Sequence, residues 1–70
     1  GQMLKADFCH EHTAVAFDCD AKKIYVAVAD PTDDALIEQI RTLTSRTPQV
    51  FLSKISEILN AIYFIYHEET

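Results

Sequence analysis

Seventy residues, of which 49% are hydrophobic and only one is glycine, suffice for one small folded domain and argue against an intrinsically disordered chain. The formal net charge is −5, from eleven acidic and six scattered basic residues, which disfavours binding to nucleic acid or to an acidic membrane surface. We therefore expect a single domain over residues 1–70, and one that is a fragment of a larger protein.

The sequence predicts no membrane-spanning or targeting segment. The longest apolar run near the C-terminus, residues 61–66, is far too short to cross a bilayer. The N-terminus lacks the basic and apolar regions of a signal peptide. Two cysteines are too few for a disulfide scaffold. We expect a cytoplasmic domain that does not insert into a membrane directly.

The first part of the chain predicts a short helix followed by a strand. Apolar residues between positions 3 and 11 fit a helix weakly, without a clear capping residue. Residues 13–18 alternate as in a strand, which places Val15 and Phe17 on one face and two alanines on the other.

A hairpin is expected next, because a polar turn at residues 19–22 separates this strand from a second one at residues 24–29. A connection of four residues suits antiparallel neighbours. The alternation then assigns the residues of both strands to two faces. One face carries Val15, Phe17, Ile24, Val26 and Val28, and the other carries Ala14, Ala16, Tyr25, Ala27 and Ala29.

The segment after the second strand predicts a capped amphipathic helix. Pro31 cannot donate a ladder hydrogen bond, so the strand should end at Asp30. Either Thr32 or Asp33 can cap the helix that follows. Carboxylates here could also hold a divalent cation, but at a helix start they are far more often caps. The helix then carries an apolar stripe of Leu36, Ile40 and Leu43.

A third strand and a last helix complete the predicted elements. Pro48 marks the exit from the preceding helix, and residues 49–52 form a short strand. Ser53 is expected to cap the last helix, although Ser56 stands where a complete capping box has Glu or Gln. The strongest periodic signal of the chain is the apolar face of this helix, formed by Ile55, Ile58, Leu59, Ile62 and Tyr66.

The predicted fold is α/β, of the α+β type, with the order α-β-β-α-β-α. Residues 24–52 form a strand–helix–strand unit that should close as a right-handed crossover with parallel strands. The result is a two-layer sandwich in which a small three-stranded mixed sheet packs against amphipathic helices. We expect the two longer helices to cover the sheet face that carries the valines, which consists of Val15, Phe17, Ile24, Val26, Val28, Val50 and Leu52.

Four residues, Cys9, His10, His12 and Cys19, raise the question of a metal site. Their spacing differs from the paired clusters of structural zinc sites, although Cys9 and His12 would lie about one turn apart on a helix. We favour a helix-to-strand junction with one buried thiol and two solvated imidazoles. No metal is expected.

No catalytic motif is apparent in the sequence. A cysteine–histidine nucleophile would need a shaped pocket and an oxyanion hole, for which a chain of this size leaves little room. The chain has no Gly-Lys pair, so a phosphate-binding loop of the Walker A type is absent. We predict no catalytic residue and no cofactor.

Phe64 is an aromatic residue on the otherwise polar side of the last helix, beside Glu57 and Asn60. The alanine-rich sheet face is also mildly apolar. Either the N-terminal helix covers this face or a protein partner does, because apolar patches on small domains often mark contacts. The candidate partner surface consists of Phe64, Tyr25, Phe51, Ala27 and Ala29.

Several segments, in this order, resemble one known family. They are Val26-Ala-Val-Ala-Asp-Pro31, Ala35-Leu36, Leu43-Thr44, Val50 to Ser53, Glu57-Ile58, Ala61-Ile62 and Tyr66. They resemble the N-terminal domain of type II secretion and type IV pilus assembly ATPases (the general secretion pathway protein E family). The resemblance covers about residues 13–66, and its signature residues are Asp30, Pro31 and Tyr66.

The chain departs from the family pattern at three points. Thr44-Ser45-Arg46 replaces the usual Thr-Gly turn, so the exit of that helix should differ or run slightly longer. Glu57 lies one place beyond the usual acidic position. The Arg-Leu-Gly plus Leu pattern of the relatives that bind cyclic di-GMP is absent, so the resemblance does not imply nucleotide binding here.

The resemblance implies a non-catalytic role. Such a domain would dock a cytosolic ATPase or enzyme onto a protein partner at the inner membrane, within a secretion or envelope apparatus. Two alternatives remain open. The domain could sense a small ligand, such as a nucleotide second messenger, through the alanine-rich face and the Asp30–Pro31 turn. It could also be an accessory domain fused to a membrane glycosyltransferase.

Overall fold

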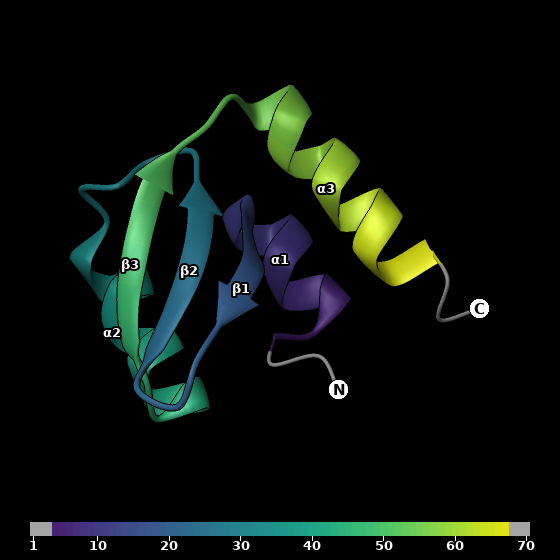
Figure 1. Ribbon diagram of the computed structural model, residues 1–70. Helices are drawn as coiled ribbons and strands as arrows, with labels where there is room; N and C mark the ends of the chain where they lie inside the picture. Colours follow the sequence, from purple (N-terminus) through teal and green to yellow (C-terminus); the bar gives the residue numbers. More distant parts are fainter. Residues whose placement is uncertain (1–3, 68–70) are drawn as a thin grey trace.

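The computed structural model describes residues 4–67, and this part of the chain forms three helices and three strands (Figure 1). In chain order the elements are α1 (Ala6–His12), β1 (Ala14–Cys19), β2 (Lys23–Val28), α2 (Asp34–Thr44), β3 (Thr47–Leu52) and α3 (Ile55–His67). The predicted element order and the α+β class are confirmed. Pro48, predicted to precede the third strand, lies inside it.

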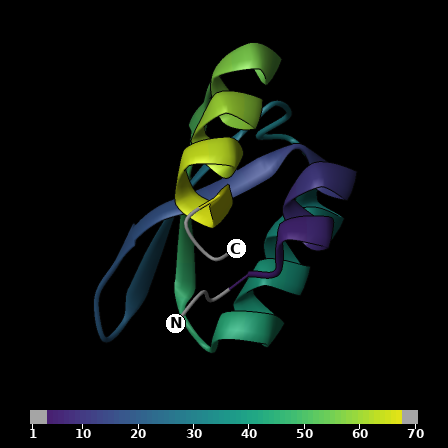
Figure 2. The same ribbon diagram turned by 90° about the vertical axis from the view of Figure 1, so that its right-hand side faces the viewer.

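The three strands form one mixed sheet in the order β1-β2-β3. β1 and β2 pair antiparallel, as expected for a hairpin, and β2 and β3 pair parallel across α2. Figure 2 shows α1 and α2 together on one side of the sheet. α3 runs along the β1 side, where it contacts β1, β2 and α1.

The core gathers around β2, the central strand. Its residues Ile24, Val26 and Val28 are all buried, and we call the sheet face that they form the valine face. Full burial of one such side chain stabilises a fold by about 1.5–3 kcal/mol. The remaining large buried side chains are Leu4, Cys9, Val15, Leu36, Ile40, Ile58 and Ile62, which belong to one continuous cluster with them.

A β-bulge in β1 overturns the predicted faces of this strand. Val15 pairs with Ala27, but the register shifts between Ala16 and Asp18, which leaves Phe17 as the extra residue. Because a shift of one residue moves side chains to the other face, Val15 and Phe17 lie opposite the valine face. The prediction that they share that face is wrong. Ala14 and Ala16, which pair with Val28 and Val26, lie on the valine face instead.

The hairpin turn is tighter than the predicted four residues. The Asp20 N–H donates to the carbonyl oxygen of Lys23 at 2.8 Å, so only Ala21 and Lys22 remain in the loop. The Asp20 carboxylate accepts the N–H groups of Lys22 and Lys23 at 2.8 and 2.7 Å. These hydrogen bonds hold the pKa of Asp20 below its ordinary value.

The ends of α2 are formed by two local hydrogen bonds. Asp33 caps the helix, as predicted, by accepting the N–H of Leu36 at 3.1 Å. Ser45 ends it in the left-handed conformation, with φ of 55°, and donates its N–H to Arg41. The family's usual glycine is the residue that most easily takes this conformation. The chain therefore makes a left-handed exit with a serine.

The start of α3 differs from the prediction. The helix begins at Ile55, and its first backbone hydrogen bond runs from the Ile58 N–H to the Lys54 carbonyl oxygen at 3.0 Å. Lys54 therefore occupies the capping position, and the prediction that Ser53 caps this helix is wrong. The Ser53 N–H donates to Val28 at 2.9 Å and extends the ladder between β2 and β3.

Candidate interaction surface

Three aromatic rings from three different strands lie together on the face opposite the valine face. The Phe17 ring centroid is 5.7 Å from that of Phe51 and 6.4 Å from that of Tyr25, and the latter two are 6.4 Å apart. Tilted pairs at such distances are favourable ring contacts. We call this side of the sheet the aromatic face.

The ring cluster on the aromatic face is partly open to solvent. Phe17 is 54% exposed and Phe51 is 48% exposed. α1 contacts β1 and α3, and it lies with α2 on the other side of the sheet (Figure 2). The interpretation in which the N-terminal helix covers the alanine-rich face is therefore wrong. Val15, on the β1 side of the same face, is buried.

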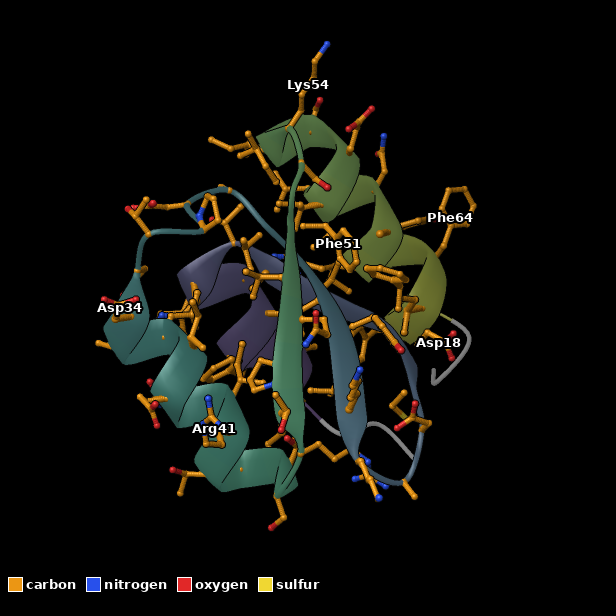
Figure 3. The ribbon with its side chains drawn as sticks, turned by 60° about the vertical axis from the view of Figure 1, so that its left-hand side comes forward. Asp18, Asp34, Arg41, Phe51, Lys54 and Phe64 are labelled. Atoms are coloured by element: carbon orange, nitrogen blue, oxygen red, sulfur yellow. The ribbon has the colours of Figure 1, made fainter. Side chains whose placement is uncertain are left out.

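The predicted surface residues divide into three groups. Tyr25 and Phe51 lie in the ring cluster, whereas Ala27 and Ala29 are half-buried and pack against the core. Phe64 is 73% exposed on α3, and its ring contacts that of Tyr63 at 5.8 Å. In Figure 3, Phe51 points from β3 toward the side on which α3 and Phe64 lie.

Sequence reasoning missed Phe17, the member of the cluster contributed by β1. Simple alternation across the turn places Phe17 opposite Val26, and only the bulge moves it beside Tyr25. The one available signal was the presence of a large aromatic residue in each strand.

Charged groups border the aromatic face. Asp18 follows Phe17 at the bulge and is exposed, and its carboxylate accepts the Cys19 N–H at 2.8 Å. Lys23, also exposed, lies two residues before Tyr25 and thus on the same face of β2. An apolar centre with a charged rim is the usual anatomy of a protein–protein interface.

Two of the signature residues form a self-contained turn. The Asp30 carboxylate accepts the N–H of Thr32 at 3.0 Å and its hydroxyl at 2.5 Å. Both hydrogen bonds hold the pKa of Asp30 below its ordinary value, and the one from the Thr32 hydroxyl has the larger effect. Pro31 between them is half-buried.

The third signature residue, Tyr66, connects α3 to the start of the described chain. Its hydroxyl donates to the carbonyl oxygen of Leu4 and lies 3.5 Å from the sulfur of Cys9. All three signature residues thus have structural contacts within the domain.

A comparison with models of protein families identifies the family to which the chain belongs. The family model of the MshEN domain matches residues 1–70, the whole chain. The chain belongs to the MshEN domain family. This is the N-terminal domain of type II secretion and type IV pilus ATPases, so the relationship indicated by the sequence resemblance is confirmed. No curated protein and no solved structure matches the chain.

The cysteines and histidines of this MshEN domain lie apart from one another. Cys9 is buried on α1, where burial raises the pKa of its thiol despite the nearby Tyr66 hydroxyl. Cys19 is exposed at the far end of β1. The His12 ring contacts the ring of Phe8 at 4.5 Å, while His10 is exposed. Among residues 4–67, no three His, Cys, Asp or Glu side chains gather as metal ligands would.

A shallow apolar groove lies between α1 and α2 of the MshEN domain. Its volume is about 350 Å³, which is at the lower end of the range for small-ligand sites. Neither Asp30 nor Pro31 is among the described residues that line it. The described residues that line it are Leu4, Lys5, Phe8, Gln39 and Leu43.

The helices of this MshEN domain are short. None in the described range is both long and apolar enough to cross a bilayer.

Proposed function

We propose that this MshEN domain is a non-catalytic docking module. It would attach a secretion or pilus-assembly ATPase, or a related envelope protein, to a protein partner on the cytoplasmic side of the inner membrane. The observation that carries this proposal is the ring cluster of Phe17, Tyr25 and Phe51, in which Phe17 and Phe51 are still about half exposed. Membership in the family supports the same reading.

The chemistry of the aromatic face supports protein recognition. Aromatic residues dominate the binding energy of many interfaces, because they bury a large area with little loss of side-chain freedom. Phe17 and Phe51 are about half exposed, so a partner could still remove much of their surface from water.

The placement of the polar groups supports the absence of catalysis. The Asp33 carboxylate caps α2, and that of Asp30 is engaged by Thr32. The buried Cys9 thiol has a raised pKa, which disfavours the nucleophilic thiolate. These groups already have structural roles.

The test uses the full-length parent protein and the same protein without residues 1–70. We expect the intact protein to sediment with membranes and the truncated one to remain in the soluble fraction, while hydrolysis of ATP by a downstream ATPase domain persists. Membrane association that survives the truncation would exclude docking by this domain.

Point variants of the full-length protein locate the docking surface. Phe51→Ser should release the protein from membranes, whereas Leu43→Ser should not. Leu43 is the matched control because it is an exposed apolar residue on α2 and not part of the aromatic face. Equal effects of the two variants would speak against the aromatic face.

Small-ligand sensing is the second candidate, and the groove between α1 and α2 is the observation that favours it. Titration with cyclic dinucleotides and common metabolites, followed by amide chemical shifts, separates the two functions. Saturable shifts at Phe8 and Leu43 would favour sensing in the groove, and shifts at the Asp30–Pro31 turn would favour the site expected from the sequence.

A further inference from the structure

The two edges of the sheet are built differently. β1 forms one edge, where the bulge at Phe17 interrupts the ladder and where α1 and α3 make contact. β3 forms the other edge, and its pairing with β2 continues without a bulge from Thr47 to Leu52. Proteins usually protect an edge strand with bulges, charged side chains or a covering element. The β3 edge has one such protective feature, Pro48 near its start, and residues 49–52 that follow it carry no charged side chain.

Two backbone amides of β3 point away from the sheet. They are identified from the amides that point inward. The Thr47 N–H donates to the carbonyl oxygen of Lys22 and the Ser53 N–H to that of Val28, both at 2.9 Å. In a parallel pair, alternate residues direct both backbone groups to the neighbouring strand. The N–H groups of Val50 and Leu52 therefore point outward. Pro48 stands at a third outward position, where its missing N–H does not weaken the ladder.

The side chains of this edge suit a further strand. Residues 49–52 carry no charge, and Leu52 is 72% exposed. Phe51 brings the row of rings to the open edge, so a strand paired with β3 would place a side chain directly beside it. That neighbour would cover the exposed part of the Phe51 ring.

The ends of β3 indicate the charge of the added strand. Arg46 precedes β3 and Lys54 follows it, so a cation lies at each end of a neutral segment. In an antiparallel pair of two copies centred on Val50, Arg46 of one copy would face Lys54 of the other. Like charges at opposed positions destabilise a strand pair.

We propose that β3 accepts a fourth strand from a partner protein. The partner segment is extended and free of proline, apolar or aromatic at its centre, and acidic at the end that faces Lys54. Its backbone pairs with the outward amides of Val50 and Leu52, and its central side chain covers Phe51. This inference rests on the proposed docking function and specifies the kind of partner.

The probe is an eight-residue peptide, capped at both termini, with alternating valine and threonine, a central tyrosine and an aspartate at each end. We expect saturable binding and slower hydrogen exchange at the amides of Val50 and Leu52. A peptide with lysine at each end should bind more weakly, and a peptide with proline at its centre should not bind. Unchanged exchange at both amides, or equal binding of the proline peptide, would overturn strand addition.

The matched variants are Leu52→Pro and Leu52→Ala. Both remove an exposed side chain, but only the proline variant also removes the outward N–H. Leu52→Pro should weaken binding of the aspartate peptide roughly tenfold relative to Leu52→Ala, because it removes a backbone hydrogen bond and obstructs pairing. Equal affinities of the two variants would contradict the proposal.

A charge exchange tests the orientation toward Lys54. The variant Lys54→Glu should prefer the lysine-ended peptide over the aspartate-ended one, which reverses the preference of the parent chain. An unchanged preference would exclude Lys54 as the charged neighbour of the added strand. Sedimentation of the chain alone provides a further check, because a dimer that Leu52→Pro abolishes would identify a second copy as the occupant.

Failure of strand addition can be separated from failure of docking. In the full-length parent, Leu52→Pro should release the protein from membranes as Phe51→Ser does. If Leu52→Pro retains membrane association and Phe51→Ser loses it, docking stands and strand addition is excluded. If both retain it while residues 1–70 are dispensable, the proposed function itself is excluded.

Discussion

The hydroxyl of Tyr66 donates a hydrogen bond to the carbonyl oxygen of Leu4, which joins the last turns of α3 to the segment before α1. The two residues are 62 positions apart in the chain. Leu4 is buried, and α1 and α3 are in contact. A signature tyrosine of the family thus holds the two ends of the described chain together.

Tyr66→Phe removes this hydrogen bond and leaves a partly buried carbonyl oxygen without its donor. We expect the free energy of unfolding to fall by about 1–2 kcal/mol, which urea denaturation can measure. Tyr25→Phe is the control, because it removes a hydroxyl and leaves the ring in the aromatic cluster; its effect should stay within about 0.5 kcal/mol. Equal effects would contradict the role assigned to Tyr66.

Ser45→Gly should stabilise the domain. Ser45 has φ of 55°, and a residue with a Cβ atom is less stable in this conformation than glycine. Glycine loses more entropy on folding, which offsets part of this effect. The expected increase in the free energy of unfolding is about 0.5–1 kcal/mol. Gln39→Gly, in the middle of α2, should destabilise by a similar amount because glycine weakens a helix interior. Thermal denaturation of both variants measures the difference, and a loss of stability in Ser45→Gly would refute the prediction.

The rings of Phe17 and Phe51 should be energetically coupled. A double-mutant cycle with Phe17→Ala and Phe51→Ala is expected to give a coupling energy of about 0.5–1.5 kcal/mol. The cycle of Phe17 with Phe64 is the control, because no ring contact joins these two residues and their effects should add. Additive effects in the first cycle would mean that the contact between the Phe17 and Phe51 rings contributes nothing to folding stability.

The stability of the domain should decline in acid partly through Asp20. Its folded pKa lies below the ordinary value of 3.8 because its carboxylate accepts two backbone N–H groups, those of Lys22 and Lys23. A depressed pKa stabilises the fold above the unfolded pKa, and this contribution is lost as pH falls below 3.8 through the folded pKa. Asp20→Asn keeps an acceptor but does not titrate, so its unfolding free energy should fall less between pH 4 and pH 2. Parallel curves for the two proteins would exclude this role.

The element order was predictable because local signals agree with the fold. β2 ends at Val28, shortly before Pro31, and Asp33 caps the next helix through a hydrogen bond to a residue three positions away. The apolar positions Ile58 and Ile62 repeat at helical spacing and are both buried. Such features depend on neighbouring residues, and the sequence displays them directly.

The ring cluster was not predictable because it depends on contacts between distant residues. No residue near Phe17 predicts a bulge. The position of Phe51 beside Phe17 follows from the pairing of β3 with β2. The side of the sheet on which α1 packs was not predictable either, because the short sequence of α1 does not indicate a packing partner. The sequence around Ser53 is typical of a helix cap, but the Ser53 N–H instead donates a hydrogen bond to Val28 and extends the pairing of β3 with β2.

The single extra residue in β1 has a consequence for how this domain can evolve. Loss of one codon within the strand would restore regular pairing and turn Phe17 toward the core, where Ala16 now lies against Val26. Loss of one residue in β1 would therefore remove the Phe17 ring from the outer surface of the sheet. The parallel pairing of β2 with β3 does not depend on this residue, so the outer surface of β1 can change by a single insertion or deletion without a change in the rest of the sheet.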